Sequence, residues 1–569
     1  MNTASFGPPF STSNSDVPGN ATARTTIALL LFWMVAFVMV RWAGTANGDD
    51  HSHSRQEQRR ARFQELRETA FLTLRHELSE LSQRCHDQGL LQAAQDLTAI
   101  SLELTNSQNE SFRLPSMVQL PVSSRLPEAE RLWRVRLRAL REDKAAELYS
   151  LGRKALGADL PTLAYQLIKD TLRLDPDHQA SRRTLGLQLF HDRTRQDDDT
   201  YAGEWVSEFE ARKRSGSVPE ENHPEFGWIP SRHVARYENG ERPWKTGWVS
   251  VAKEAELRRD FRNAWEIESE HFLVKTNTSR EEGVRIVNQL EMFHEWLTSN
   301  FAAFFETPAE LKKRFEEAQP RSRSVRDAEP MKVHYYATRA EYDRVIRSKS
   351  ELLARVVTNG LYWEPDRTSY FFRNPDDESL LTVFHEATHQ ILDLATAADR
   401  RTAARKRKAV LRQPQIRDWV MCENSNFWML EGIACYFESI RISDGAIVVG
   451  DPGYVRFQAA QQRLLRDNFY VPLQLFSGLG KDAFQHHPNL PQLYSQASGF
   501  AHFLLHYQNG TYRDDFVRLL SAAYRPDLKN VLKEPSLEEI TGVKFAVLDQ
   551  QYREHLHQLS MQTAQIEQP

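Results

Sequence analysis

The chain of 569 residues is predicted to be an α+β protein rich in helix, with an all-α domain ahead of a mixed one. From about residue 58 to 191, apolar residues recur at a spacing of three to five, as on one face of a helix. From about residue 265 onward, short strand-like runs alternate with longer helical stretches. The length is also too great for one typical core and suggests two or three domains.

Changes in composition divide the chain further. Residues 1–24 are rich in Ser, Thr, Asn, Gly and Pro, which predicts disorder. Residues 201–260 contain four tryptophans, and we interpret them as a packed connector because exposed linkers seldom carry so many. The expected divisions are a disordered N-terminus (1–24), a signal peptide or membrane anchor (25–42), a linker (43–57), a helical domain (58–200), a Trp-rich connector (201–260) and a mixed domain (261–560).

Residues 145–186, within the helical domain, resemble a tetratricopeptide repeat (TPR). The small residue Ala164 stands where the two helices of such a repeat cross, and Pro176 follows the second helix. The resemblance implies a surface for a protein partner. One repeat is fewer than a solenoid needs, so a TPR-like domain and a helical bundle packed on the mixed domain both remain open.

Three strands are expected in the mixed domain. They are residues 272–275, 331–336 and 368–372, which are rich in aromatic and other apolar side chains. A helix over residues 280–301 follows the first strand. After residue 431 the chain is predicted to be mainly helical.

Residues 25–40 are the most apolar segment and lie between Arg24 and Arg41. The segment fits the apolar region of a signal peptide, with residues 43–46 as a cleavage site. It also fits a short membrane anchor, because about 17 residues is the lower limit for a spanning helix. Both interpretations predict export, to a membrane-anchored, periplasmic or extracellular location, and the uncleaved form would have the membrane as a partner.

Charge and cysteine usage argue against two classes of protein. The net charge of −4 and the pI near 6.6 give no electrostatic basis for binding nucleic acid. Three cysteines, Cys85, Cys422 and Cys435, are too few for a disulfide framework. Buried thiols are expected, with a single Cys422–Cys435 bridge as the alternative.

The most specific signal is residues 385–389 (HEATH), an H-E-x-x-H motif. On a helix, His385 and His389 lie one turn apart on the same face, so both imidazoles can reach one metal ion. Glu386 is turned by about 100° and can approach a water on that ion. Two imidazoles, one carboxylate and an open position form a catalytic Zn²⁺ site, and Glu431 is the candidate carboxylate.

The surroundings of the motif favour a metal site over an ordinary helix with two incidental histidines. Residues 374–377 (NPDD) predict the helix start, with an N-cap, a proline and acidic residues in the first turn. Glu431 belongs to a second, apolar helix expected to begin near Ser425 or Asn426, and a glutamate is rarely buried there without a partner. The core face of the first helix is predicted to comprise Leu380, Leu381, Phe384, Leu392 and Ala395.

The H-E-x-x-H motif and residues 431–438 (EGIACYFE) together resemble the gluzincin group of zinc metallopeptidases. The arrangement is closest to exported bacterial proteins of this type. The resemblance spans about residues 265–556 and implies a thermolysin-like domain. It implies that His385, His389 and Glu431 bind Zn²⁺, that Glu386 is the general base, and that the substrate is a peptide or protein.

The resemblance also implies a tyrosine on a later helix that stabilises the oxyanion of the reaction. Tyr494 is the matching residue. His502 and His506, expected on the same helix, are alternatives for that role, although a structural role suits each of them better. In this group the strand before the metal helix, here residues 368–372, borders the cleft and pairs with an extended substrate.

The sequence departs from the aminopeptidase version of the pattern. Leu430 stands where an Asn precedes the ligand Glu, and Cys435 stands where some gluzincins have an Asp that pairs with a ligand histidine. The G-x-M-E-N motif that captures a free amine is absent from the sequence. The nearest glutamate, Glu364, precedes a proline and is expected to face solvent. We therefore predict an endopeptidase.

Two other functions stay open, a non-catalytic interaction protein with a vestigial metal site and a zinc hydrolase of a non-peptide substrate. The complete motif with Glu386 argues against the first, because a structural site has no need of that carboxylate. The basic stretch 400–412 is expected to be a loop between the metal motifs. It either attracts acidic groups or is a solvated insertion.

Overall fold

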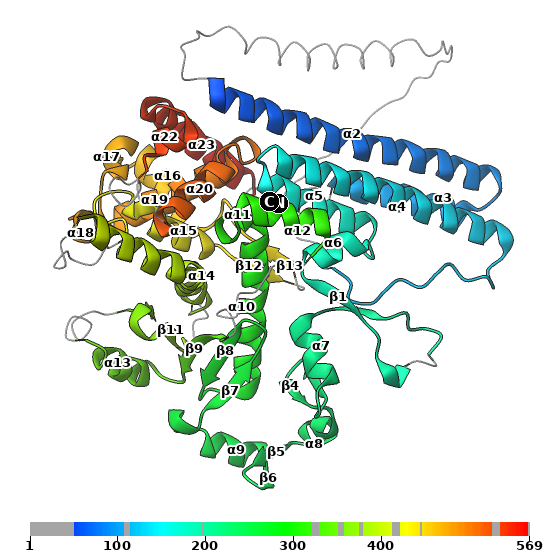
Figure 1. Cartoon of the computed structure of the whole chain (residues 1–569), viewed down its shortest axis with the longest axis horizontal. Helices are drawn as coiled ribbons and strands as arrows, with labels where there is room; N and C mark the ends of the chain where they lie inside the picture. The colour runs from blue at the N-terminus through cyan, green and yellow to red at the C-terminus, as the bar shows by residue number, and fades with distance from the viewer. Residues whose placement is uncertain are drawn as a thin grey trace, which may run out of the picture. The chain divides into compact units, whose positions relative to one another are not determined.

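The computed structural model of the chain describes residues 51–106, 114–195, 198–319, 329–350, 358–374, 379–411, 421–443, 446–525 and 535–566. Over these residues the chain is a helix-rich α+β protein, as the sequence predicts (Figure 1). The expected disordered N-terminus and the apolar segment 25–42 lie outside the described residues. Within the described part, no helix is both long and apolar enough to cross a membrane.

The N-terminal helices share one hydrophobic core, which includes Leu74, Leu97, Leu148 and Ile168. The first of these helices begins at His51, so the last residues of the expected linker are helical. The long helices have the expected apolar periodicity and lie side by side (Figure 1). They are α2 (His51–Asp87), α3 (Leu91–Asn106), α4 (Glu128–Gly157) and α5 (Pro161–Leu174), followed by α6 (Gln179–Thr184).

The pair α4 and α5 forms a close helical hairpin. A Cβ added at Gly152 would lie 3.3 Å from the backbone oxygen of Ala164, so the small residues permit the close crossing. The core also takes in Leu311 and Phe315 of α12 (Pro308–Glu317). The helical pair therefore packs against a later part of the chain, and its likeness to a TPR stays a prediction.

The Trp-rich connector contains regular structure. Strand β2 pairs with a strand that precedes the connector, and two further antiparallel pairs follow. The indole of Trp205 is buried, as expected for a packed segment. The elements are β1 (Leu187–Phe190), β2 (Glu204–Ser207), α7 (Glu208–Ser215), β3 (Glu220–His223), β4 (Gly227–Pro230), α8 (Val234–Glu238), β5 (Glu241–Trp244), β6 (Gly247–Ser250) and α9 (Val251–Leu257).

A mixed sheet with the strand order β10-β11-β9-β8-β7 is the centre of the remaining chain (Figure 1). Strands β8, β9 and β11 run parallel, and the edge strands β7 and β10 are antiparallel to their neighbours. The three expected strands are all confirmed. The bounds are β7 (Trp265–Glu268), β8 (Phe272–Thr276), α10 (Arg280–Asn300), α11 (Ala302–Phe305), β9 (Met331–Tyr336), α13 (Arg339–Arg347), β10 (Gly360–Trp363) and β11 (Thr368–Phe372).

The expectation that residues 368–372 border the cleft is wrong. Strand β11 is hydrogen-bonded to β10 on one side and to β9 on the other, and all five of its residues are buried. It therefore has no edge to offer a substrate. The edge strand next to β11 is β10, which is four residues long. Strand order depends on contacts distant in sequence, so the local pattern could not show it.

The metal motif lies on α14 (Ser379–Leu411), and this helix extends to Leu411. The basic stretch expected as a loop is thus largely the end of this helix. Of the helix start predicted at residues 374–377, residues 375–377 fall outside the described residues. The later elements are α15 (Phe427–Phe437), β12 (Arg441–Ser443), β13 (Ala446–Val448), α16 (Val455–Leu465), α17 (Leu473–Ser477), α18 (Lys481–Gln485), α19 (Leu490–His506), α20 (Arg513–Tyr524), α22 (Leu537–Thr541) and α23 (Phe545–Ile566).

A buried glutamine fixes α14 to the sheet. The Gln390 side-chain nitrogen donates to the backbone oxygens of Lys332 and Arg367, each at 3.0 Å. Its oxygen accepts a hydrogen bond of 2.9 Å from the hydroxyl of Ser369 on β11. A buried amide with these partners is satisfied, and it sets the rotation of the helix one residue after His389.

Helix α15 packs against α19 at Gly432. A Cβ added there would lie 2.7 Å from the backbone oxygen of Ala497, closer than a side-chain carbon can stay. The glycine therefore permits the approach of the two helices beside Glu431.

Replacing Gly432 with Ala should destabilise the protein by about 1–3 kcal/mol, because the added methyl must push α15 from α19. Urea denaturation measures the change. Gly157→Ala is the matched control, since nothing lies within 4 Å of a Cβ added at that position near the end of α4. Equal stability of the two variants would contradict the close approach.

Candidate metal centre

The three predicted ligands lie together between α14 and α15. The Nε2 atoms of His385 and His389 are 3.3 Å apart. An oxygen of Glu431 lies 3.6 Å from the first and 3.9 Å from the second. All three side chains are largely shielded from solvent. The H-E-x-x-H spacing therefore brings the two imidazoles together as predicted, and Glu431, 42 residues after His389, lies beside them.

These distances and donors fit a zinc ion. Zinc binds imidazole nitrogen and carboxylate oxygen at about 2.0–2.2 Å, so two tetrahedral ligands lie about 3.3–3.5 Å apart. The three separations are at or slightly above that range. Two nitrogens and one oxygen on three side chains leave a fourth position for water or substrate, as in catalytic zinc sites.

Glu438 orients one of the ligand histidines. Its carboxylate lies 2.7 Å from Nδ1 of His385. Because an ionised carboxylate only accepts hydrogen bonds, Nδ1 carries the proton and the lone pair of Nε2 faces the other ligands. A carboxylate behind a ligand imidazole is a common support of metal sites.

Glu438 is itself held by two side chains. The hydroxyl of Tyr454 donates to it at 2.6 Å, and the guanidinium of Arg456 donates to both of its oxygens. Burial alone would raise the pKa of the Glu438 carboxyl, but its contacts with His385 and Arg456 outweigh burial and lower the pKa to about 2. The sequence carried one signal for this role, because Glu438 ends the second motif seven residues after Glu431 and so shares its helix face.

The site favours a positive charge between its carboxylates. Burial lowers the pKa of His385, but contacts with Cys435, Glu431 and Glu438 outweigh burial and hold the pKa well above its usual range. Burial raises the pKa of Glu431, but the neighbouring imidazoles outweigh burial and lower it. The pKa of His389 is lowered, chiefly by burial. Either a proton on His385 or a metal ion can supply the positive charge.

The cysteines are buried thiols, as expected, and the alternative bridge between Cys422 and Cys435 is wrong. Cys435 lies beside His385 and Glu438, and burial raises the pKa of its thiol. Cys435 stands where some gluzincins have an Asp that pairs with a ligand histidine, and it is close to His385 here. The carboxylate that performs the pairing comes from the next turn of the helix.

Glu386 faces the edge strand. The backbone N–H of Tyr362 on β10 donates to its carboxylate at 2.7 Å. The Tyr362 hydroxyl also donates to Asp393, two turns further along the helix from Glu386. Glu386 is therefore held between α14 and β10. Glu364, at the end of β10, has 72% of its side chain exposed and faces solvent as predicted.

The structure brings Tyr494 to the metal group. This residue lies in the first turns of α19, and its hydroxyl interacts with the Glu431 carboxylate. Burial, and then the charge of Glu431, raise the pKa of Tyr494, so the hydroxyl keeps its proton at neutral pH. It can donate a hydrogen bond near the zinc ligands.

The two alternative histidines on α19 belong to another network. Nδ1 of His502 lies 2.9 Å from Nε2 of His555, and Nε2 of His502 lies 3.0 Å from the backbone oxygen of Gly450. Nε2 of His506 lies 2.7 Å from the hydroxyl of Tyr436. These contacts give both rings structural partners, and Tyr494 is the better candidate to act near the metal group.

The chain was compared with known proteins. No protein-family model matches it, and no curated protein matches it.

Glu438→Gln should weaken zinc binding by about 10–100-fold, because the imidazole of His385 loses its charged partner. Competition with a chromogenic chelator measures the affinity. Glu364→Gln is the matched control, as it removes an exposed carboxylate near the same helix. Unchanged affinity in Glu438→Gln would remove the residue from the support of the site.

The stability of the wild type and that of Glu438→Gln should depend differently on pH. The pKa of Glu438 is lowered from 4.5 to about 2 in the folded protein. Its stabilising effect is therefore present above about pH 4.5 and is lost as the pH falls towards 2. Between about pH 4.5 and 2, the wild type should therefore lose more stability than Glu438→Gln, which acid titration followed by circular dichroism measures.

Proposed function

We propose that the protein is a zinc-dependent metallopeptidase that hydrolyses internal peptide bonds. The observation that carries the proposal is the convergence of His385, His389 and Glu431 at zinc-ligand spacing, with Glu386 beside them on the same helix. A structural zinc site closes its fourth position with a protein ligand, whereas this group has three ligands and a carboxylate that is not one of them.

The arrangement of elements supports a thermolysin-like domain. An H-E-x-x-H helix packs on a mixed sheet whose edge strand is antiparallel, and the third ligand comes from the next long helix. We propose that the N-terminal helices form a TPR-like interaction domain. Exposed apolar residues on their surfaces support a protein partner, among them Leu72, Leu91, Leu102 and Leu132.

In the proposed reaction, His385, His389 and Glu431 hold the zinc ion. The ion would lower the pKa of a water molecule and polarise the scissile carbonyl. Glu386 takes the proton from that water on its carboxylate and later delivers it to the leaving amine. The N–H of Tyr362 holds the carboxylate in place while it carries the proton.

Tyr494 is proposed to stabilise the oxyanion. Its phenol stays protonated because burial and Glu431 raise its pKa, so it has a hydrogen to donate. Donors placed before the reaction stabilise charge that develops in the transition state.

The substrate is proposed to extend along β10. This strand is at the edge of the sheet beside α14, where Glu386 takes the outward N–H of Tyr362, so an added peptide would pair with the other outward backbone groups of the strand. A peptide can add to such an edge through backbone hydrogen bonds. Glu364 faces solvent, so it does not close the end of the strand against a longer chain.

We retain the proposal of export, with the chain anchored in a membrane or released after cleavage near residues 43–46. Its basis is the apolar segment 25–40 in the sequence. The remaining alternatives are a non-catalytic interaction protein and a hydrolase of non-peptide bonds. A casein digest with and without chelator separates these alternatives from a peptidase.

Glu386→Gln should abolish hydrolysis of casein and keep about one zinc in this site, because the residue acts on the water and not on the ion. Elemental analysis and a digest with and without chelator make the two measurements. His385→Ala is the comparison variant and should lose zinc as well as activity. Loss of zinc from Glu386→Gln would make the residue a ligand, and full activity would remove it from the mechanism.

Peptides with an acetylated N-terminus should be cleaved as readily as free peptides. No carboxylate is placed on β10 to bind a free amine, so a chain can pass along the strand in both directions. Mass spectrometry of a peptide-library digest locates the cuts, and Glu364→Gln should leave the pattern unchanged. Release of single N-terminal residues only, blocked by acetylation, would point to an aminopeptidase.

A further inference from the structure

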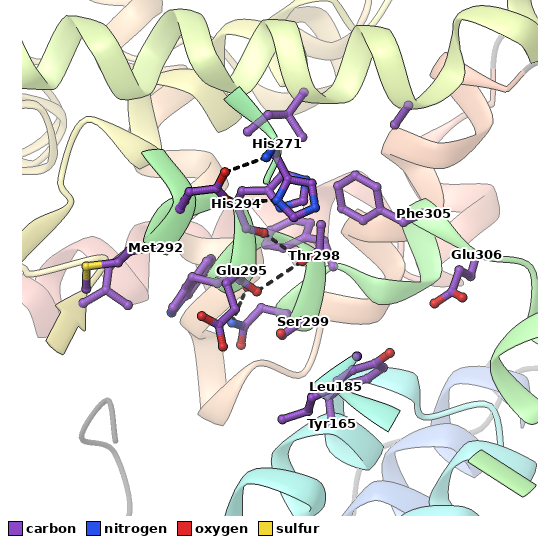
Figure 2. A pocket seen from close by; sticks show the side chains of 18 of the residues that line it. Tyr165, Leu185, His271, Met292, His294, Glu295, Thr298, Ser299, Phe305 and Glu306 are labelled. Atoms are coloured by element: carbon purple, nitrogen blue, oxygen red, sulfur yellow. Dashed lines mark hydrogen bonds and ion pairs between the residues drawn. The ribbon is translucent and has the colours of Figure 1, made fainter. Parts of the chain in front are cut away.

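A second group of metal-binding side chains lies away from the first. His271 is in the turn between β7 and β8, while Glu291 and His294 are three residues apart on α10. One ligand atom from each residue lies within 4.8 Å of the others. All three line a large cleft, and Figure 2 shows His271 and His294 together on its wall.

Glu291 is held in a fixed position. One of its oxygens accepts hydrogen bonds of 2.6 Å from the hydroxyl of Ser269 and from the backbone N–H of His271. Its other oxygen lies 2.8 Å from Nδ1 of His271. Burial alone would raise the pKa of this carboxyl, but the contacts with His271 and Ser269 outweigh burial and lower the pKa. The carboxylate is thus ionised and its orientation is set.

The two imidazoles are arranged face to face. Their ring centres are 3.8 Å apart and the planes are inclined by 27°. Nδ1 of His271 and the Glu291 oxygen 2.8 Å from it would be two of the ligand atoms, with the ion in place of the proton that they share. His294 is buried by its position on α10 and by the edge contact with Phe272.

We propose that His271, Glu291 and His294 form a second binding site for a divalent transition-metal ion, with zinc as the best-fitting ion. Imidazole nitrogen and carboxylate oxygen are ligands of zinc, and a Glu-x-x-His pair on one helix recurs in metal sites of helical proteins. Two ligand atoms on a tetrahedral zinc ion lie about 3.3–3.6 Å apart, so atoms that are up to 4.8 Å apart would have to close by up to about 1.5 Å.

The proposed ion would add a link between the β7–β8 turn and α10, which the hydrogen bonds to Glu291 already join. The ion would connect the β7–β8 turn through His271 to α10 through His294. Its remaining positions face the cleft, where water or an oxygen ligand can complete the coordination. No residue is shared with the first site, so the two sites can be tested separately.

The test uses the full-length protein, stripped with a chelator and reloaded with zinc. Wild type should hold about two zinc ions per chain, and His385→Ala/His389→Ala should keep about one. Adding His294→Ala or His271→Ala to that double variant should remove the remaining ion. Cobalt provides a second reading, because its visible absorption should show a nitrogen- and oxygen-ligated ion in the double variant that the added substitutions abolish.

Two further variants control for misfolding and for zinc that is bound by exposed histidines. Glu291→Gln keeps the shape of the side chain and should weaken zinc binding in the double variant by about 10-fold or more while the thermal transition of the zinc-free protein persists. His76→Ala removes an exposed imidazole of α2 and should leave the zinc content unchanged. The proposal is overturned if the double variant binds no zinc, or if it keeps zinc after both His271 and His294 are replaced.

Discussion

The burial of two carboxylates on one face of an apolar helix is the constraint from which the metal centre follows. Glu431 and Glu438 lie two turns apart on α15 and its C-terminus, among residues that are nearly all buried and apolar. Arg456 neutralises Glu438, so Glu431 has the two imidazoles and Tyr494 as partners. An unpaired buried charge is costly, and the same charge draws in either a proton on His385 or a divalent ion.

This constraint explains several features of the surrounding packing. The face of α14 that carries both histidines must point at Glu431, and the buried hydrogen bonds of Gln390 fix that rotation against the sheet. Helix α15 must approach α19 closely enough for Tyr494 to reach Glu431, and Gly432 is the residue that leaves room. The site therefore depends on two close helix contacts as much as on the ligands themselves.

Much of the fold and the three ligands could be predicted from the sequence because these features are local. The bounds of strands β9 and β11 and the start of α10 are those that the sequence predicts, to the residue. The H-E-x-x-H spacing brings His385 and His389 together by helix geometry alone. The register between distant segments could not be predicted. It places β10, and not β11, at the sheet edge.

The residues that support the ligands, and the second His–Glu group, were harder to identify because they too depend on how distant segments pack. Glu438 has the periodicity of a residue on the Glu431 face, but its pairing with Arg456 and Tyr454 requires the chain to return from β13 to α16. His271 and His294 are 23 residues apart across a hairpin and a helix, and the short Glu291-x-x-His294 pattern does not include His271. Histidine and glutamate pairs of this kind become visible only when the turn between β7 and β8 is placed against α10.

The two His–Glu groups are connected through an aromatic core. Phe293, next to His294 on α10, packs edge-on against Phe384 and Phe437, with ring centres 5.5 and 5.1 Å away. Phe384 precedes His385, and Phe437 precedes Glu438. Both groups thus rest on the same buried rings, which are apolar and close-packed and transmit little charge. The two groups share no side chain, so we expect each of the proposed ions to be removed without removing the other, although both groups are built on one core.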